Sequence, residues 1–227
     1  MSFILFVFVF IGIFVATHFY RKHVLAQRKL EMQAAAQSLG YACEDNLTHL
    51  LMQFKHFKLL QNGRSQEFLN VMGGQNNGFD VRIGDYRYVT GSGRSRRSHH
   101  VSLVILQKQG AALPHFFVRK EMAVFDFLGK VFGGQDINFV DDPVFSNAFV
   151  LQGLVERDVR VLFSPQVRQQ FSMFASQSIT IEGHNDMLLF HKNVAVPGNG
   201  LATLECDAMD LFTLLSNQAE QAGFVRG

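Results

Sequence analysis

The most conspicuous polar cluster in the sequence is residues 91–100, Gly-Ser-Gly-Arg-Ser-Arg-Arg-Ser-His-His. Guanidinium groups bind phosphate oxygens in pairs of hydrogen bonds, so Arg94, Arg96 and Arg97 are candidate contacts to an anionic surface. The plainer alternative is a solvated loop that keeps a hairpin soluble. A nucleic-acid contact requires a broader basic face with stacking aromatic side chains, so no nucleic-acid partner is expected.

Metal and nucleotide chemistry find little support in the same cluster. His99 and His100 are adjacent, and adjacent residues of a strand point to opposite faces, which disfavours a shared metal ion. The Gly-x-Gly at residues 91–93 does not open a helix and lacks the Gly-Lys-Ser/Thr of a phosphate-binding loop. Cys43 and Cys206 lack the spacing of metal ligands, and whether they pair is left open.

Acidic and hydrolytic motifs are equally weak. Asp136, Asp141 and Asp142 lack the alternating oxygen ligands of a calcium loop, so we expect a turn and a helix cap before Pro143. The sequence contains no Gly-x-Ser-x-Gly elbow that would join a serine to His184 or His191. We expect both of these histidines at exposed positions. No catalytic, metal-binding or cofactor-binding residue is predicted, and no cofactor is expected.

The N-terminal segment is the element that could hold the chain, and its basic residues, close to a membrane. Residues 3–15 carry no charged or strongly polar side chain, and residues 16–20 extend the run before Arg21 and Lys22 end it. Eighteen helical residues span about 27 Å, close to the lower limit for crossing a bilayer. We therefore predict an uncleaved transmembrane anchor at residues 1–20. A cleaved signal peptide is the competing interpretation, but the segment lacks a basic n-region and an Ala-x-Ala site.

The charges that follow the anchor set its orientation. Arg21, Lys22, Arg28 and Lys29 lie C-terminal of the apolar run, and no Lys or Arg precedes it. The positive-inside rule then places the rest of the chain in the cytoplasm, at the inner membrane. Residues 21–40 are predicted to form a basic stalk helix, ended by a glycine at position 40. Arg21 and Lys22 are further candidate contacts to anionic headgroups.

The remainder of the chain is predicted to be an α+β domain. The chain has 227 residues, a net charge of +2, 24 phenylalanines and no tryptophan, which fits one large domain or two small ones. Residues 41–125 are predicted to form an antiparallel β meander. Its strands are expected at residues 68–72, 79–90, 101–107 and 116–119, with a turn cluster at residues 73–78 and a bulge or bend at Gly84-Asp85.

Residues 126–227 repeat the pattern in a looser β-α-β-β-α form. Strands are expected at residues 147–152, 178–182 and 187–192, the last two joined by a four-residue connection at residues 183–186. Helices are expected at residues 156–162, 166–175 and 204–222, the second one capped by Ser164 and begun by Pro165. The two halves form either two similar sheet-and-helix subdomains or one continuous sheet.

Several short motifs resemble a group of bacterial single-pass membrane-anchored proteins that carry a domain of unknown function. They are the apolar N-terminal segment, Leu-Gly-Tyr at residues 39–41, residues 86–93 with their basic tail, Leu-Pro-His-Phe at 113–116, residues 136–139 and 143–150, and Leu-Phe-Ser-Pro at 162–165. The resemblance covers most of the chain after the anchor. It implies one recurring domain and no assigned activity.

Two functional interpretations follow. The first is a non-enzymatic cytoplasmic interaction module held at the membrane by one helix, with anionic lipid headgroups, another membrane protein or further copies of the chain as partners. The second is an enzyme with an unrecognised site that acts on a membrane-derived substrate. Convergent His, Asp or Glu side chains in a cleft would favour the enzyme, and an open sheet with scattered polar residues would favour the module.

Overall fold

The computed structural model describes residues 2–44, 52–61, 63–121 and 136–224. Its helices are α1 (Ser2–Leu39), α3 (Pro143–Ala148), α4 (Glu156–Leu162), α5 (Pro165–Phe171) and α6 (Leu201–Gln221), with short 3-10 turns η1 (Leu59–Gln61), η2 (Gly93–Ser95), η4 (Ser172–Phe174) and η5 (Gly198–Gly200). Its strands are β1 (Ala42–Cys43), β2 (Arg64–Asn76), β3 (Phe79–Thr90), β4 (Arg97–Gln107), β5 (Leu113–Lys120), β6 (Phe149–Gly153), β7 (Thr180–Asn185) and β8 (Met187–His191).

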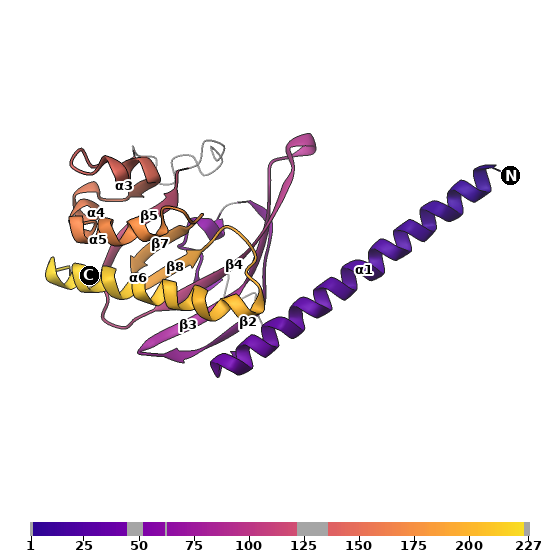
Figure 1. Cartoon of the computed structure of the whole chain (residues 1–227), viewed down its shortest axis with the longest axis horizontal. Coiled ribbons are helices and arrows are strands. Elements are labelled where there is room, and N and C mark those ends of the chain that lie inside the picture. Colours follow the sequence, from indigo (N-terminus) through magenta and orange to yellow (C-terminus); the bar gives the residue numbers. More distant parts are fainter. Residues whose placement is uncertain (1, 45–51, 62, 122–135, 225–227) are drawn as a thin grey trace.

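All eight strands belong to one antiparallel sheet, in the order β1-β2-β3-β4-β8-β7-β5-β6. The predicted α+β class, with flanking helices, is confirmed. Of the two arrangements that the sequence allowed, the structure has the continuous sheet, because β4 of the first half pairs directly with β8 of the second. Figure 1 shows α6 crossing the sheet and α1 running past its edge.

Helix α1 is continuous over 38 residues, about 57 Å at 1.5 Å per residue. The predicted stalk helix does continue from the N-terminal segment, and Gly40 follows it with a left-handed φ of +72°. Met32, Ala35 and Ala36 are buried against the domain. The N-terminal half of α1 instead projects away from the rest of the molecule (Figure 1).

In the part of the chain whose side chains the structure describes, no helix has both the length and the apolar character that a membrane crossing needs. The predicted anchor at residues 1–20 falls partly outside that described part, which omits residue 1 and the side chains of residues 2–6, 9 and 10.

The β2–β3–β4 meander confirms the expected alternation but corrects two predicted breaks. Strand β3 pairs with β4 without interruption through Gly84 and Asp85, so no bulge or bend occurs there. The irregularity lies opposite, in β2 between Leu69 and Met72, where Asn70 has a φ of +50°. The predicted turn at residues 73–78 is also shorter, because β2 continues to Asn76 and leaves a two-residue turn.

Strand β5 corrects the predicted topology of the first half. It was expected to complete the meander beside β4, but it lies between β7 and β6. The place beside β4 is taken by β8, through five residue pairs from Leu103↔His191 to Gln107↔Met187. The meander therefore consists of β2, β3 and β4 alone, and in the rest of the sheet β5 of the first half lies between β7 and β6 of the second.

The C-terminal half largely matches the prediction. Helices α4, α5 and α6 form where expected, and the Ser164 hydroxyl accepts the N–H of Val167 as an N-cap. Strand β6 begins only at Phe149, because Pro143–Ala148 forms a helix that was not predicted. Strand β7 extends to Asn185, whose φ of +54° allows a tight connection to β8 in place of the four-residue one.

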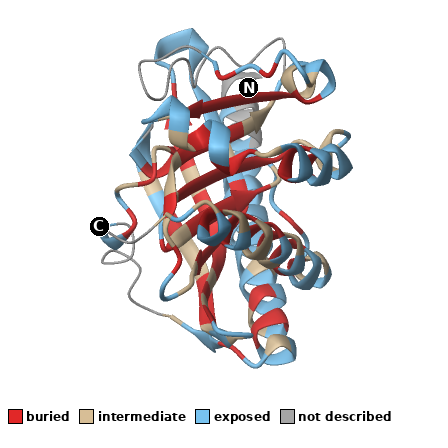
Figure 2. Cartoon of the chain, turned by 90° about the vertical axis from the view of Figure 1, so that its left-hand side faces the viewer, coloured by how far each residue is buried: buried red, intermediate tan, exposed pale blue. Residues whose placement is uncertain are grey.

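The sheet has two unequal faces. Helices α1, α4, α5 and α6 cover one face and share its larger apolar core, which includes Val81, Ile83, Val104 and Phe116. On the other face, residues 54–60 contribute Phe54, Phe57, Leu59 and Leu60 to a smaller cluster, together with Tyr86, Leu103 and other strand residues. Figure 2 shows buried residues concentrated in the strands between these layers.

Candidate functional site

The predicted basic loop is the tip of the β3–β4 hairpin. Its last four residues belong to strand β4, so the turn itself is residues 91–96, and we call this turn together with Arg97 the tip. Gly91 has a φ of +66°, and a Cβ there would lie 2.3 Å from the Ser95 carbonyl oxygen, so only glycine fits. The Ser95 hydroxyl donates to the carbonyl of Ser92 at 2.8 Å. Short local contacts thus shape the tip and leave the arginine side chains outside it.

The five predicted anionic-surface residues occupy two separate elements. Arg94, Arg96 and Arg97 are exposed at the hairpin tip, and Arg21 and Lys22 are exposed on α1. Within the described residues, none of the five forms a salt bridge. The hairpin and the N-terminal half of α1 leave the domain toward the same side of the molecule (Figure 1).

His99 and His100 lie on opposite faces of β4, as predicted. The His99 ring stacks on Tyr88 with centroids 4.6 Å apart, and its Nε2 lies 2.8 Å from Thr90 Oγ1. Burial and the charge of Arg97 lower the pKa of His99. His100 faces α1, with Nε2 3.7 Å from the carboxylate of Asp85. The two histidines of the basic cluster therefore make contacts on opposite faces of the β3–β4 hairpin.

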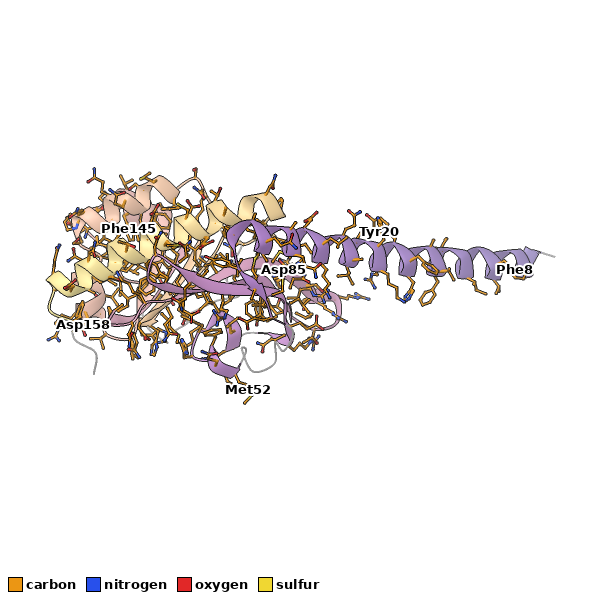
Figure 3. The ribbon with its side chains drawn as sticks, turned by 90° about the horizontal axis from the view of Figure 1, so that it is seen from below. Phe8, Tyr20, Met52, Asp85, Phe145 and Asp158 are labelled. Atoms are coloured by element: carbon orange, nitrogen blue, oxygen red, sulfur yellow. The ribbon has the colours of Figure 1, made fainter. Side chains whose placement is uncertain are left out.

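A buried ion pair that the sequence did not predict holds α1 against the sheet. The guanidinium of Arg28 donates from Nε and Nη2 to the two oxygens of Asp85, each at 2.8 Å. Asp85 is 0 % exposed, and the side chain of Arg28 is 13 % exposed. Figure 3 shows Asp85 beside α1, on the domain side of Tyr20. A bidentate pair of this kind fixes both distance and orientation.

Further hydrogen bonds complete this site, which we call the α1 lock (Arg28, Asp85, Ser102 and Asn70). The Ser102 hydroxyl donates to Asp85 at 2.8 Å and accepts from Arg28 at 3.0 Å and from the N–H of Val196 at 2.9 Å. Asn70 donates to Asp85 at 3.1 Å. Positive φ at Asn70 therefore places its amide on the carboxylate, and Ser102 links the lock to the loop before α6.

Electrostatics favour the charged form of the lock. Burial by itself would raise the pKa of Asp85. Hydrogen bonds from Arg28 and Asn70, the charge of Arg28 and the nearby His100 ring outweigh burial and hold the pKa of Asp85 well below its usual range. The hydrogen bond to Asp85 raises the pKa of Arg28. Both groups are charged at neutral pH.

A second buried carboxylate lies toward the opposite face. Glu182 in β7 is 0 % exposed. Its two oxygens accept the N–H of Lys58 at 2.9 and 2.7 Å, and one also accepts the N–H of Leu59 at 3.4 Å. His115 in β5 brings Nε2 to 2.9 Å from the same carboxylate. Glu182 therefore ties the backbone of residues 58–59 to the sheet.

Three histidines gather beside Glu182, and we call these four residues the histidine cluster. The His184 ring lies 5.0 Å from that of His56 and 4.6 Å from that of His115, centroid to centroid. Burial and the neighbouring imidazoles lower the pKa of His56 to about 4 and also lower that of His184, while Asp186 opposes both shifts. His56 and His184 are therefore neutral at pH 7. A search of the described residues finds no group of three or more His, Cys, Asp or Glu side chains suited to hold a metal ion.

Two predicted exposures were wrong. His184 is half-buried inside strand β7 rather than in a turn. His191 is buried at 1 % exposure, and burial lowers its pKa to about 3. Its Nδ1 accepts the N–H of Asn193 at 3.0 Å. Because β8 lies inside the sheet rather than at its edge, every residue of that strand has neighbours on both sides.

The acidic pair before α3 has the capping role that was predicted. Asp142 accepts the N–H of Phe145 at 2.9 Å. Both Asp141 and Asp142 also bind the buried guanidinium of Arg168, at 2.7 and 2.9 Å. Cys43 and Cys206 are free and exposed, which answers the question of their pairing.

Comparisons with known proteins identify a fold but not a family. No family model matches this sequence, and none of the curated proteins compared with it matches. The crystal structure of the mycobacterial trehalose monomycolate transport factor A, TtfA, is similar with a TM-score of 0.53. The two chains are 12 % identical, and the match covers 85 % of this chain and 94 % of that one. At this identity the likeness concerns the fold alone.

Proposed function

We propose that this chain is a non-enzymatic module, anchored by α1 in the inner membrane, that works beside the bilayer as an accessory to the transport of a membrane lipid. The observation that carries the proposal is the surface of α1. Phe8, Ile13 and Phe14 are 67, 57 and 74 % exposed, and with about 3.6 residues per turn they point to three different sides of the helix. A helix that is apolar on all sides and has no protein around it is suited to a lipid environment.

The fold likeness supports the lipid-transport part of the proposal. TtfA is named as a transport factor for trehalose monomycolate. A shared fold alone does not transfer a function, but here it coincides with an apolar helix that projects from the domain. We take the combination as support for a role near a transported lipid, without a catalytic step.

Charge supports the orientation and the compartment. The basic residues nearest the apolar run, Arg21 and Lys22, follow it, so the positive-inside rule favours a cytoplasmic sheet domain. Cys43 and Cys206 are free thiols at the surface, in keeping with a reducing compartment. The proposed partners are anionic lipid headgroups, another membrane protein or a second copy of the chain.

Topology and extraction of the full chain test this proposal. After washing of membranes with alkaline carbonate, the chain should stay in the pellet. A phosphatase that is active only in the periplasm, fused to the C-terminus, should show no activity. An active fusion would contradict the orientation. Crosslinking in intact membranes followed by affinity capture should then recover a membrane transporter. Complete release of the chain by carbonate would show that α1 does not anchor it in the membrane.

The histidine cluster supports a second candidate, an enzyme that acts on a membrane-derived substrate. His56, His115 and His184 come from three distant segments, and a neutral imidazole such as that of His56 or His184 can act as a general base. However, Glu182 is fully enclosed and already accepts backbone N–H groups, an arrangement suited to anchoring a segment. Incubation of the full chain with labelled membrane lipids, followed by chromatography, tests the candidate. A product that His184→Gln abolishes would favour the enzyme.

A further inference from the structure

The β3–β4 tip carries positive charge with nothing in the described structure to neutralise it. Arg94, Arg96 and Arg97 are exposed, and no carboxylate forms a salt bridge with any of the three among the described residues. The residues between positions 91 and 98 are otherwise glycine and serine. Because the tip has no apolar side chain to insert into hydrocarbon, its chemistry suits the phosphate layer of a membrane surface.

The α1 lock sets the height of this tip relative to the helix. From Asp85 to Thr90, strand β3 advances about 17 Å at about 3.3 Å per residue. From Arg28 back to Arg21, helix α1 advances about 10 Å at 1.5 Å per residue. Both paths start at the same ion pair and lead to the same side, the hairpin inclined away from the helix (Figure 1). The hairpin path is the longer of the two, and because it is inclined, its advance along the helix axis is shorter than about 17 Å.

We infer that the hairpin tip is a second membrane contact, which binds anionic phospholipid headgroups at the level where Arg21 and Lys22 leave the bilayer. This inference rests on the proposed function, because the anchor determines where the membrane surface lies. The five cations then form two contacts on one plane, separated across the molecule. A helix alone leaves the domain free to tilt relative to the membrane surface, and the second contact restricts that tilt.

The partner is an anionic membrane surface rather than nucleic acid or a free anion. The three arginines lie on one short tip, and we find no stacking aromatic side chain between them, as single-stranded nucleic acids require. Attraction to anionic lipids falls off within a Debye length, about 8–10 Å near physiological salt, so only charges held at the surface contribute. The contact should therefore depend on lipid charge and weaken with salt.

A fluorescence experiment on the full chain tests the contact. In a background with Cys43→Ser and Cys206→Ser, a fluorophore is attached at Ser98→Cys, an exposed position beside the tip. The protein is reconstituted into vesicles that contain a quencher on the lipid headgroup. Vesicles of phosphatidylcholine alone are compared with vesicles that contain a third phosphatidylglycerol. A label at Met173→Cys, exposed beside the α5 end of the domain, is the positional control.

We expect quenching at Ser98→Cys to be at least threefold stronger in the anionic vesicles, and this difference to disappear at 0.5 M NaCl. The combined change Arg94→Ser, Arg96→Ser and Arg97→Ser should abolish it, while Arg157→Ser, which removes an exposed cation elsewhere, should leave it unchanged. The Met173→Cys label should show no difference between the vesicles. Added inorganic phosphate at equal ionic strength should compete no better than chloride.

Two failures are distinguishable. If alkaline carbonate extracts the chain from the vesicles, the anchor is wrong, and the level of the tip loses its basis as well. If the chain stays integrated but quenching is equal in neutral and anionic vesicles, or survives the triple arginine change, the proposed function stands and the second contact is wrong.

Discussion

Asp85 and Glu182 are two fully buried carboxylates that hold additional segments against the two faces of one sheet. Asp85 fixes helix α1 on the helix-covered face through Arg28. Glu182 fixes residues 58–59, part of the segment that supplies the apolar cluster of the other face, through backbone N–H groups. The same chemical group therefore performs the same task with a charged side chain as partner in one place and with the main chain in the other.

This difference determines which substitutions can break each attachment. The main-chain attachment at Glu182 cannot be removed from its donor side by a side-chain substitution, and Phe57 and Leu59 add apolar burial beside it. The lock at Asp85 depends on one guanidinium from a residue distant in sequence. The polar part of the junction between α1 and the domain therefore depends on Arg28, beside the apolar burial of Met32, Ala35 and Ala36.

The largest effect is expected for Arg28→Ala. The change leaves Asp85 buried without its counter-charge, which typically costs about 3–5 kcal/mol. Denaturation of the full chain in detergent should show that loss in the free energy of unfolding. Lys29→Ala, at the neighbouring exposed position, serves as the control and should change stability by less than about 0.5 kcal/mol. Equal effects of the two changes would refute the central role of the lock.

Glu182→Gln should have a smaller effect, of about 1–3 kcal/mol, because the amide keeps one acceptor oxygen but turns N–H groups toward the backbone donors. Hydrogen exchange should accelerate at the amides of Lys58 and Leu59, whereas α1 keeps its protection. Glu67→Gln, at an exposed pair with Arg87, is the matched control, with less than about 1 kcal/mol expected. Loss of protection in α1 would show that the two attachments are not independent.

Acid should affect the histidine cluster and the α1 lock at different pH values. The lowered pKa values of His56 and His184 mean that the unfolded chain binds more protons below about pH 6.5, the ordinary pKa of histidine. Stability of the histidine cluster is therefore present above pH 6.5 and declines as pH falls toward about 4. Asp85, whose pKa is lowered, loses its contribution only at lower pH.

The measurement is the protection factor of the Lys58 and Leu59 amides, which should fall severalfold between pH 7 and 4.5 while the amides of residues 32–36 in α1 stay protected. His56→Gln should reduce this pH dependence, because glutamine does not titrate. An unchanged pH profile in that variant would assign the acid sensitivity to other groups, such as buried His191.

The smallest effect is expected at the hairpin tip. The combined change of Arg94, Arg96 and Arg97 to serine removes three exposed charges that form no salt bridge within the described residues, so the midpoint of thermal unfolding should shift by no more than about 2 °C. A larger shift would mean that the tip helps to attach α1 to the domain. Asp85 would then not be the sole polar attachment to compare with Glu182.

Much of the fold followed from local patterns in the sequence. The helix ending before Gly40, the alternation in β3 and the cap at Ser164 were predicted because each depends on neighbouring residues. Strand β5 was misplaced because pairing order depends on contacts across the whole chain. The helix over Pro143–Ala148 was missed although Asp142 and Pro143 carry the cap signal for it.

The site was less accessible from the sequence. Asp85 was interpreted as part of a break, since Gly-Asp disfavours strands locally, and its partner Arg28 lies 57 positions earlier. Glu182 carries no signal, because its donors belong to the main chain. The five basic residues were singled out because short runs of charge are visible in the sequence itself, and their contact with an anionic surface stays a prediction.

The pairing of β4 with β8 has a consequence for synthesis. The outer edge of Leu103–Gln107 has its partner in Met187–His191, so 84 residues separate Gln107 from the end of β8. At about 5–20 residues per second, the ribosome needs about 4–17 s to supply the partner strand. Throughout that interval the nascent chain presents an open, apolar strand edge, a template for pairing with other chains. Chaperone dependence should be greatest in this interval.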